Sequence, residues 1–240
     1  MKRVKEDLET FVQRLQQAAG ANLVSLMLYG SAARNDFHEK YSDVNLLCVL
    51  RDIGGPALNR LVPVVHWWSK ELHHRPPLFV TAEELKTSAD VFAIETLDLK
   101  SNHQLLAGQD VLSDLEVPMN LHRVQLEHEL RAMLMRLRHH YLLVSEDEHE
   151  LEKTLAKSIS SVLVLFRHAL IAAGQPAVPE DKREALARVT EVFGINTAAL
   201  HAVLDVREGR RIQTGIGTLY QNYMECVAKM TSQVDRMELK

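Results

Sequence analysis

The chain has 240 residues, of which 46% are hydrophobic and 25% are charged, so its length and composition suit one large or two ordinary globular domains. Its formal net charge of −4 argues against a general nucleic-acid-binding protein, because such proteins usually have a basic excess. The N-terminal sequence MKRVKEDLETF is too charged for a signal peptide, and we expect no membrane span, which takes about 18 apolar residues. Two cysteines, Cys48 and Cys226, lie far apart in apolar segments, which favours a reduced, cytoplasmic protein with buried thiols over a disulfide framework or a metal cluster.

The first half of the chain alternates short apolar runs with amphipathic segments. Residues Lys2–Ala19 place apolar side chains three and four positions apart, which is typical of a helix packed by one face. Leu23–Tyr29 and Val44–Leu50 are apolar on both sides and about one strand long, which indicates buried strands of a mixed sheet. Thr81 precedes acidic residues, as an N-cap does. In chain order we then expect a helix over Ala57–Leu72, a strand over Leu78–Val80, a helix over Ala82–Ser88 and a strand over Phe92–Lys100.

The second half is helical throughout. Leucine and methionine recur every three or four residues from Met119 onward, and Pro118 marks the boundary between the halves. Several helices with short links predict an antiparallel bundle. The sequence therefore predicts an α+β protein whose domains are residues 1–117 and 118–240. The expected bundle helices are Leu121–Val144, Glu152–Ala173, Pro179–Phe193, Thr197–Arg207 and Gly217–Met237.

The candidate site lies in the stretch LVSLMLYGSAARNDFHEKYSDVNLLCVL, where two apolar runs flank a polar connection. Gly30 lacks a Cβ, so the backbone there can turn sharply and approach a ligand. Gly30 and Ser31 would offer N–H groups and a hydroxyl to phosphates, and Arg34 is a candidate phosphate contact. Asp43 would bind Mg²⁺, which prefers hard oxygen ligands, and position 45 would face the same way, because residues two apart on a strand share a face.

The segments LYGSAAR and YSDVNLL resemble the hallmark of the DNA polymerase β-like nucleotidyltransferase superfamily, which is Gly-Ser, a spacer of this length and Asp-x-Asp or Asp-x-Glu. The wider frame is similar to the kanamycin-type nucleotidyltransferases. The resemblance implies a mixed sheet flanked by helices followed by a C-terminal helical bundle, Mg²⁺ or Mn²⁺ as cofactor, an NTP donor with ATP as the first candidate, a hydroxyl acceptor and a homodimer.

The resemblance also implies a third carboxylate on a later strand, which completes the metal site or accepts the proton of the acceptor hydroxyl. Glu95 and Asp98 both lie in the expected strand Phe92–Lys100, where they would point to opposite faces. Ile94-Glu95-Thr96 looks like the strand that supplies this carboxylate in aminoglycoside adenylyltransferases. Glu95 is therefore the first choice, as both catalytic residue and metal ligand, and Asp98 is the alternative catalytic residue.

The chain departs from the family's pattern at Asn45, which replaces the second metal-binding carboxylate. Asparagine keeps one oxygen and loses the charge, and contacts to charged groups are roughly twice as strong as neutral ones. Two hypotheses follow. The first is an Mg²⁺-dependent nucleotidyltransferase that moves a nucleoside monophosphate to a hydroxyl of a small molecule or protein. The second is a catalytically weakened or inactive nucleotide-binding or regulatory module, similar to an antitoxin.

Overall fold

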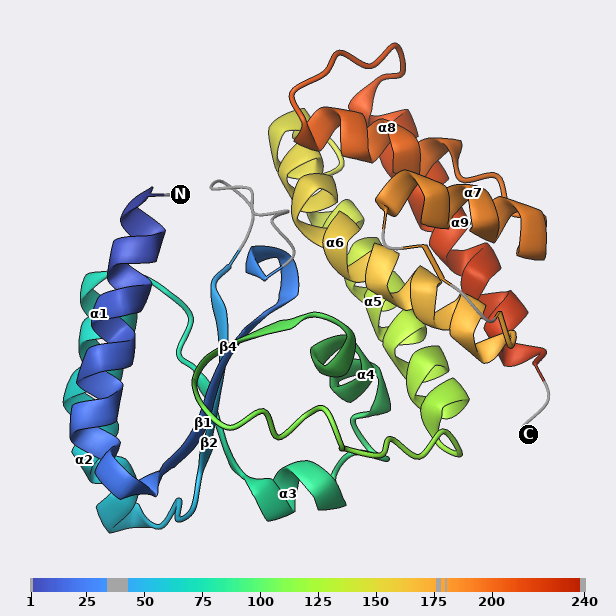
Figure 1. Ribbon diagram of the computed structural model, residues 1–240. Helices are drawn as coiled ribbons and strands as arrows, with labels where there is room; N and C mark the ends of the chain where they lie inside the picture. The colour runs from blue at the N-terminus through green and yellow to red at the C-terminus, as the bar shows by residue number, and fades with distance from the viewer. Residues whose placement is uncertain (1, 34–42, 176–177, 180, 238–240) are drawn as a thin grey trace. The chain divides into compact units, whose positions relative to one another are not determined.

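The computed structural model describes residues 2–33, 43–175, 178–179 and 181–237. The chain divides into two compact units, Met1–Pro118 and Met119–Lys240. The first unit holds a small sheet with helices, and the second is helical in its described residues (Figure 1). The predicted α+β class, a mixed sheet flanked by helices and then a helical C-terminal half, is confirmed.

The sheet of the first unit has the strand order β3-β2-β1-β4. The central strand β1 runs antiparallel to both β2 and β4, whereas β3 pairs with β2 in parallel. The sheet is therefore mixed, as predicted. Its strands are β1 (Leu23–Tyr29), β2 (Asn45–Leu50), β3 (Leu78–Thr81) and β4 (His103–Gly108).

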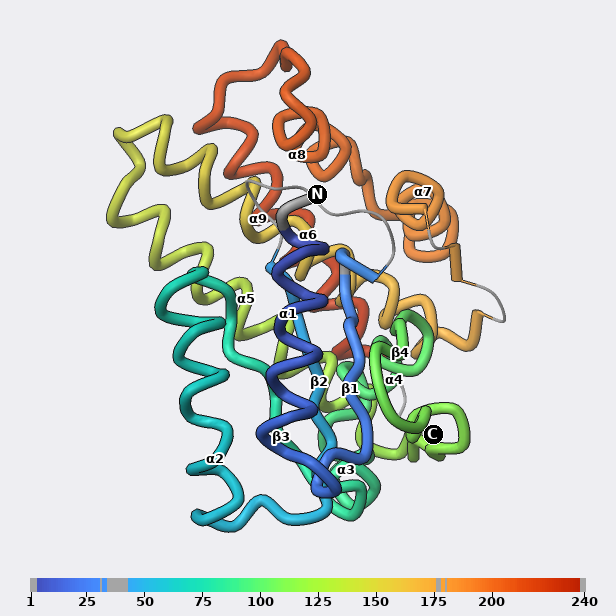
Figure 2. Tube along the Cα trace, turned by 60° about the vertical axis from the view of Figure 1, so that its left-hand side comes forward, coloured from blue at the N-terminus to red at the C-terminus, as the bar shows by residue number. Residues whose placement is uncertain are grey.

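Helices cover both faces of this sheet (Figure 1). The side chains of β1 and β2 alternate between two apolar clusters, because successive residues of a strand point to opposite faces. Leu28 and Cys48 pack with α1 (Lys2–Ala19) and α2 (Gly55–His66), whereas Met27 packs with α3 (Ala82–Thr87) and α4 (Ala93–Ser101). Figure 2 shows α1 passing in front of β1 and β2. The two central strands are thus buried on both sides.

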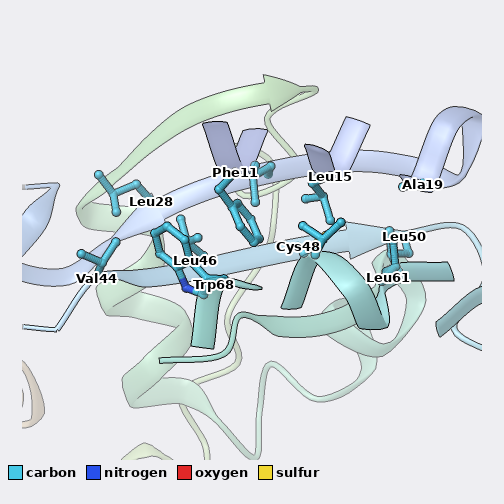
Figure 3. Close-up of a cluster of buried hydrophobic side chains, with 12 residues drawn as sticks. Phe11, Leu15, Ala19, Leu28, Val44, Leu46, Cys48, Leu50, Leu61 and Trp68 are labelled. Atoms are coloured by element: carbon cyan, nitrogen blue, oxygen red, sulfur yellow. The ribbon is translucent and has the colours of Figure 1, made fainter. Parts of the chain in front are cut away.

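Trp68 is the largest fully buried side chain among the described residues. It belongs to a π-helical segment, η3 (Trp67–Glu71), that continues α2. Its ring lies 4.7 Å from that of Phe11, centroid to centroid, and Figure 3 shows both rings beside Leu46 of β2. The indole Nε1 donates a hydrogen bond of 2.8 Å to the main-chain carbonyl of Arg75. Trp68 therefore anchors the segment that leads into β3.

The segment predicted as the fourth strand, Phe92–Lys100, is instead mostly helix α4, and that prediction was wrong. The fully buried or nearly buried residues of α4 include Ala93, Thr96 and Leu99, which are spaced by three as on a helix face. The fourth strand is the next segment, β4, which follows after a single residue, Asn102. Glu95 and Asp98 are therefore one helical turn apart and on the same side of α4, and the predicted placement on opposite faces is wrong.

The described helices of the second unit pack as a bundle. Its long helices α5, α6 and α9 contact one another, and α7 and α8 contact α6 (Figures 1 and 2). Tyr220 and Tyr223 of α9 are fully buried among them. The bounds are α5 (His122–Val144), α6 (Glu148–Ala172), α7 (Lys182–Phe193), α8 (Ala198–Arg207) and α9 (Ile216–Asp235).

Helix α6 is long and apolar enough to cross a membrane by length and composition alone, contrary to the expectation that no segment would be. More than half of its apolar stretch is buried within the protein. Fully buried side chains such as Leu155, Ile159 and Leu170 contribute to the core of the bundle. A core helix needs this composition, so the apolarity of α6 is explained by its packing.

Both cysteines are buried and not linked by a disulfide, as the sequence predicts. Burial raises the pKa of the Cys48 and Cys226 thiols to about 12. Thiols of this kind stay protonated at neutral pH and are poor nucleophiles and metal ligands.

Candidate functional site

The candidate site lies at the edge of the sheet where β1 ends and β2 and β4 begin. Because β1 is antiparallel to both neighbours, its last residue, Tyr29, stands opposite Asn45 of β2 and His103 of β4. Asp43, which lies two residues before β2, and the turn that follows β1 therefore meet at this edge. The register of the sheet thus brings Gly30, Asp43 and Asn45 to one place.

Gly30 opens a short 3-10 helix, η2 (Gly30–Ala32), directly after β1. Its φ of 77° lies in the left-handed region, which favours glycine. A Cβ at this position would lie 3.1 Å from the Asn45 amide nitrogen, closer than most real contacts. The side chain of Asn45 thus lies against the bare Gly30 backbone. The turn that the sequence predicts at Gly30 is present, and the predicted approach of its backbone to a ligand stays a prediction.

Asp43 forms an ion pair with Arg75, in which Arg75 Nε lies 3.1 Å from Asp43 Oδ2. The next residue, Val44, is 2% exposed and belongs to the core, which fixes the backbone while the Asp43 side chain stays 56% exposed. Arg75 was missed by the sequence analysis. Arg75 lies just before β3, and it reaches this edge because β3 runs parallel to β2 and starts at the same edge, a pairing that the local sequence does not indicate.

Glu95 lies within electrostatic reach of the same edge. Burial raises the pKa of the Tyr29 phenol, the positive charge of Arg75 lowers it, and the negative charge of Glu95 raises it further. The charges of Arg75, which precedes β3, and of Glu95 in α4 therefore both act on the Tyr29 phenol. Glu95 stands in the first turn of α4 and is exposed. Asp98 lies one turn further along the same helix and is partly buried.

His103 also lies at this edge, opposite Tyr29, and was not predicted from the sequence as a site residue. Its Nδ1 is 2.9 Å from the Leu99 carbonyl and its Nε2 is 3.1 Å from Asp110 Oδ2. Both ring nitrogens are thus engaged within the fold. We assign His103 a structural role, in which it links α4, β4 and the loop after β4.

The side chains of two predicted phosphate contacts, Ser31 and Arg34, are not described by the structure. The backbone of Ser31 lies in η2, and its hydroxyl stays a prediction. Arg34 lies outside the described residues, so its proposed contact is also a prediction. Of the predicted site residues, the structure brings Gly30, Asp43 and Asn45 to one edge, and Glu95 acts on the pKa of Tyr29 at the same edge.

In the part of the chain that the structure describes, the oxygen donors of this site include the carboxylates of Asp43 and Glu95 and the amide of Asn45. These are hard ligands of the kind that Mg²⁺ accepts. Within the described ranges, no group of three or more His, Cys, Asp or Glu side chains gathers as a metal cluster, and Asp43 is already paired with a cation.

Comparison with known proteins supports the fold. No protein-family model matches the chain, and no curated protein matches it. Among solved structures it is similar to a spectinomycin adenyltransferase from Enterococcus faecialis in complex with ATP and spectinomycin, with a TM-score of 0.59, 14% identity and coverage of 94% of this chain and 98% of that one. A toxin–antitoxin structure with AMP-PNP matches with a TM-score of 0.33 and 15% identity over 54% of this chain and 98% of that one, which is too weak to support an argument. The first match shows a shared fold at low identity.

Proposed function

We propose that this protein is a nucleotidyltransferase that moves a nucleoside monophosphate from an NTP, with ATP as the first candidate, to a hydroxyl of a small molecule or protein. The observation that supports this most is the meeting of Gly30, Asp43 and Asn45 at one sheet edge, with Glu95 within electrostatic reach of Tyr29 at the end of β1. The fold shared with an adenyltransferase crystallised with ATP supports the same reaction class.

Each side chain has a role in the proposed reaction. The backbone N–H groups of Gly30 and Ser31 bind phosphate oxygens, since a bare turn lets the chain approach them closely. The acceptor hydroxyl attacks the α-phosphorus, its proton passes to Glu95 or Asp98, and pyrophosphate leaves. Asp43, Asn45 and Glu95 would hold Mg²⁺ or Mn²⁺, which neutralises phosphate charge when bound.

Asn45 supports a second candidate function, a nucleotide-binding module that does not transfer. The amide replaces a charged ligand, and loss of a charged contact costs a few kcal/mol. Each 1.36 kcal/mol in a barrier is a tenfold change in rate. A site that still binds nucleotide could therefore have lost useful turnover, as in a regulatory or antitoxin-like protein.

The proposal also includes a domain division, a subfamily, an oligomeric state and a cellular location. Residues 1–117 would form the nucleotidyltransferase-like domain and residues 118–240 a C-terminal helical bundle. The kanamycin-type assignment, a homodimer and a cytoplasmic location are part of the same proposal.

A transfer assay separates the two functions. The purified protein is incubated with labelled ATP, GTP, CTP or UTP, with Mg²⁺ or Mn²⁺ and with a cell extract as the source of acceptors. Asp43→Ala removes a site carboxylate, and Asn45→Asp restores the family's charge. Glu9→Ala is the matched control, because Glu9 is an exposed acid on α1.

Transfer by the wild-type protein and by Glu9→Ala that is lost in Asp43→Ala supports the enzyme. Nucleotide binding without transfer, with activity appearing only in Asn45→Asp, supports the binding module. Absence of both binding and transfer in all four proteins contradicts both functions.

A further inference from the structure

We propose that Arg75 binds the triphosphate of the nucleotide and supplies positive charge at the edge where Asn45 has replaced a metal-binding carboxylate. This inference rests on the proposed nucleotide site. It adds a binding residue that neither the hallmark segments nor their spacing indicates. Its consequence is that nucleotide binding depends on a guanidinium and persists without a divalent cation.

The backbone of Arg75 is held firmly. Its carbonyl accepts the 2.8 Å hydrogen bond from the indole of Trp68, which is fully buried. Pro76 and Pro77 follow directly, and a residue before proline is restricted to extended conformations, while proline itself has a fixed φ. The parallel pairing of Leu47 with Leu78 then sets where this segment meets β2. A rigid main chain thus presents a long cationic side chain beside Asp43.

The side chain of Arg75, in contrast, is not used to hold the fold together. It is 69% exposed, and its partner Asp43 is 56% exposed. An ion pair between such exposed groups contributes little to stability, because water screens it and both side chains lose conformational freedom. The guanidinium can therefore leave Asp43 for a ligand at small cost. A residue whose backbone is anchored to the core and whose charged side chain is exposed is well suited to bind a ligand.

The charges at the edge favour this assignment. Among the described residues, Asp43 and Glu95 bring negative charge to the nucleotide site, and Arg75 brings positive charge through its pair with Asp43. With aspartate at position 45 and no Arg75, three carboxylates would repel a triphosphate until divalent cations bound. With Asn45 and Arg75, the edge is much less anionic before any cation binds. The two features therefore compensate each other.

The chemistry of the guanidinium suits this ligand. Arginine stays charged at all relevant pH values, and its planar fork donates paired hydrogen bonds to phosphate oxygens. The contact with Asp43 is made through Nε. A phosphate that binds beside Asp43 would meet the remaining N–H groups of the fork without a change in the backbone.

The test is ATP binding measured by titration calorimetry, once in EDTA and once in Mg²⁺. Arg75→Gln removes the charge while keeping a polar side chain of similar reach, and Arg75→Lys keeps the charge without the fork. Arg60→Gln is the matched control, because Arg60 is an exposed arginine on α2, away from the edge. Thermal unfolding of each variant checks that it is folded.

We expect the wild-type protein and Arg60→Gln to bind ATP in EDTA with the same affinity. Arg75→Gln should bind about ten- to a hundredfold more weakly, the range expected for loss of a charge-assisted contact. Arg75→Lys should recover part of this loss. In Mg²⁺ the difference between wild type and Arg75→Gln should shrink, because the cation then supplies part of the charge.

Failure of this inference can be distinguished from failure of the proposed function. If the wild-type protein binds ATP in EDTA and folded Arg75→Gln binds it equally well, the role of Arg75 is wrong and the nucleotide site stands. If wild type binds ATP only in Mg²⁺, the claim of cation-independent binding is also wrong. If wild type binds none of ATP, GTP, CTP or UTP in either condition, the site and the inference both fall.

Discussion

The polar side chains at the sheet edge of the first unit are exposed, whereas a polar pair in the interior of the second unit is buried. At the edge, the ion pair between Asp43 and Arg75 is more than half exposed on both sides. In the bundle, His122 Nε2 lies 2.8 Å from His168 Nδ1, and these residues are 2% and 1% exposed. Buried polar groups are costly unless they are paired, so the histidines are tied to the fold. An exposed pair contributes little to the fold, which leaves room for a role in binding.

The largest expected effect concerns the core beneath the edge. Trp68→Ala should lower the free energy of unfolding by about 3–5 kcal/mol, because it empties a fully buried site between α1 and β2. It also removes the hydrogen bond that anchors Arg75. Urea unfolding followed by far-ultraviolet circular dichroism measures the change.

The control for this substitution is Trp67→Ala. Trp67 is partly exposed, and the guanidinium of Arg14 lies 4.2 Å from its ring centroid. Its loss should cost about 1–2 kcal/mol, since a cation–π contact and partial burial are removed. If Trp68→Ala and Trp67→Ala lower the free energy of unfolding equally, the burial of Trp68 does not give it a larger role in the core than the partly exposed Trp67.

The second prediction tests the buried histidines through pH. Burial, and then the charge of His168, lowers the pKa of His122 from 6.5 to about 4. Between these values the unfolded chain binds a proton that the folded protein does not, so stability falls as the pH decreases from about 6.5 to 4 and is fully present above 6.5. Urea unfolding at pH 7, 6 and 5 measures this slope.

His122→Gln should make that slope shallower, because glutamine keeps hydrogen-bonding groups and does not titrate. His128→Gln is the control, since His128 is exposed on the same helix. It should leave the slope unchanged. If wild type and His122→Gln show the same slope, the protonation of His122 does not cause the loss of stability at low pH.

Much of the fold could be predicted from local patterns. The span of β1 was predicted to the residue, and the N-cap role of Thr81 is confirmed by a full capping box with Glu84. These features follow from strand alternation and from hydrogen bonds between near neighbours. The strand predicted over Phe92–Lys100 was wrong because a short apolar run is compatible with a strand and with a helix. The resemblance to aminoglycoside adenylyltransferases favoured the strand, although buried residues of this segment are spaced by three as on a helix.

The site was predicted less completely, for a physical reason. Gly30, Asp43 and Asn45 belong to one continuous stretch of sequence, so their meeting follows from two adjacent strands. Arg75 reaches the same edge through the parallel pairing of β3, which nothing in the neighbouring residues indicates. Contacts that depend on strand order are not visible in a single sequence.

The third prediction concerns the turn itself. Gly30→Ala should lower the free energy of unfolding by about 1–2 kcal/mol, because a Cβ is strained at a φ of 77° and would press on Asn45. The variant should also weaken ATP binding. Gly55→Ala is the control, since a Cβ there meets no other atom, and it should be neutral or slightly stabilising. A Gly30→Ala protein as stable as wild type would mean that the close approach of Gly30 and Asn45 is not maintained.

The smallest effect on stability is expected at the exposed pair. Asp43→Asn should change the free energy of unfolding by less than about 1 kcal/mol, because the partner Arg75 remains solvated. The same substitution should nevertheless alter the Mg²⁺ dependence of ATP binding, since it removes a carboxylate from the edge. Glu225→Gln is the matched control, because Glu225 forms an exposed ion pair of 2.8 Å with Lys229 in the second unit.

The two variants should therefore be alike in urea unfolding and different in ATP titrations with and without Mg²⁺. Both break one exposed ion pair, so any common loss of stability measures what such a pair contributes. A change in nucleotide binding confined to Asp43→Asn then belongs to the position of Asp43 beside Gly30 and Asn45 and not to the loss of a surface charge. If Asp43→Asn instead destabilised the protein by several kcal/mol, the pair would be a structural element, and the contrast between an edge available for binding and a bundle that uses its polar groups for folding would not hold.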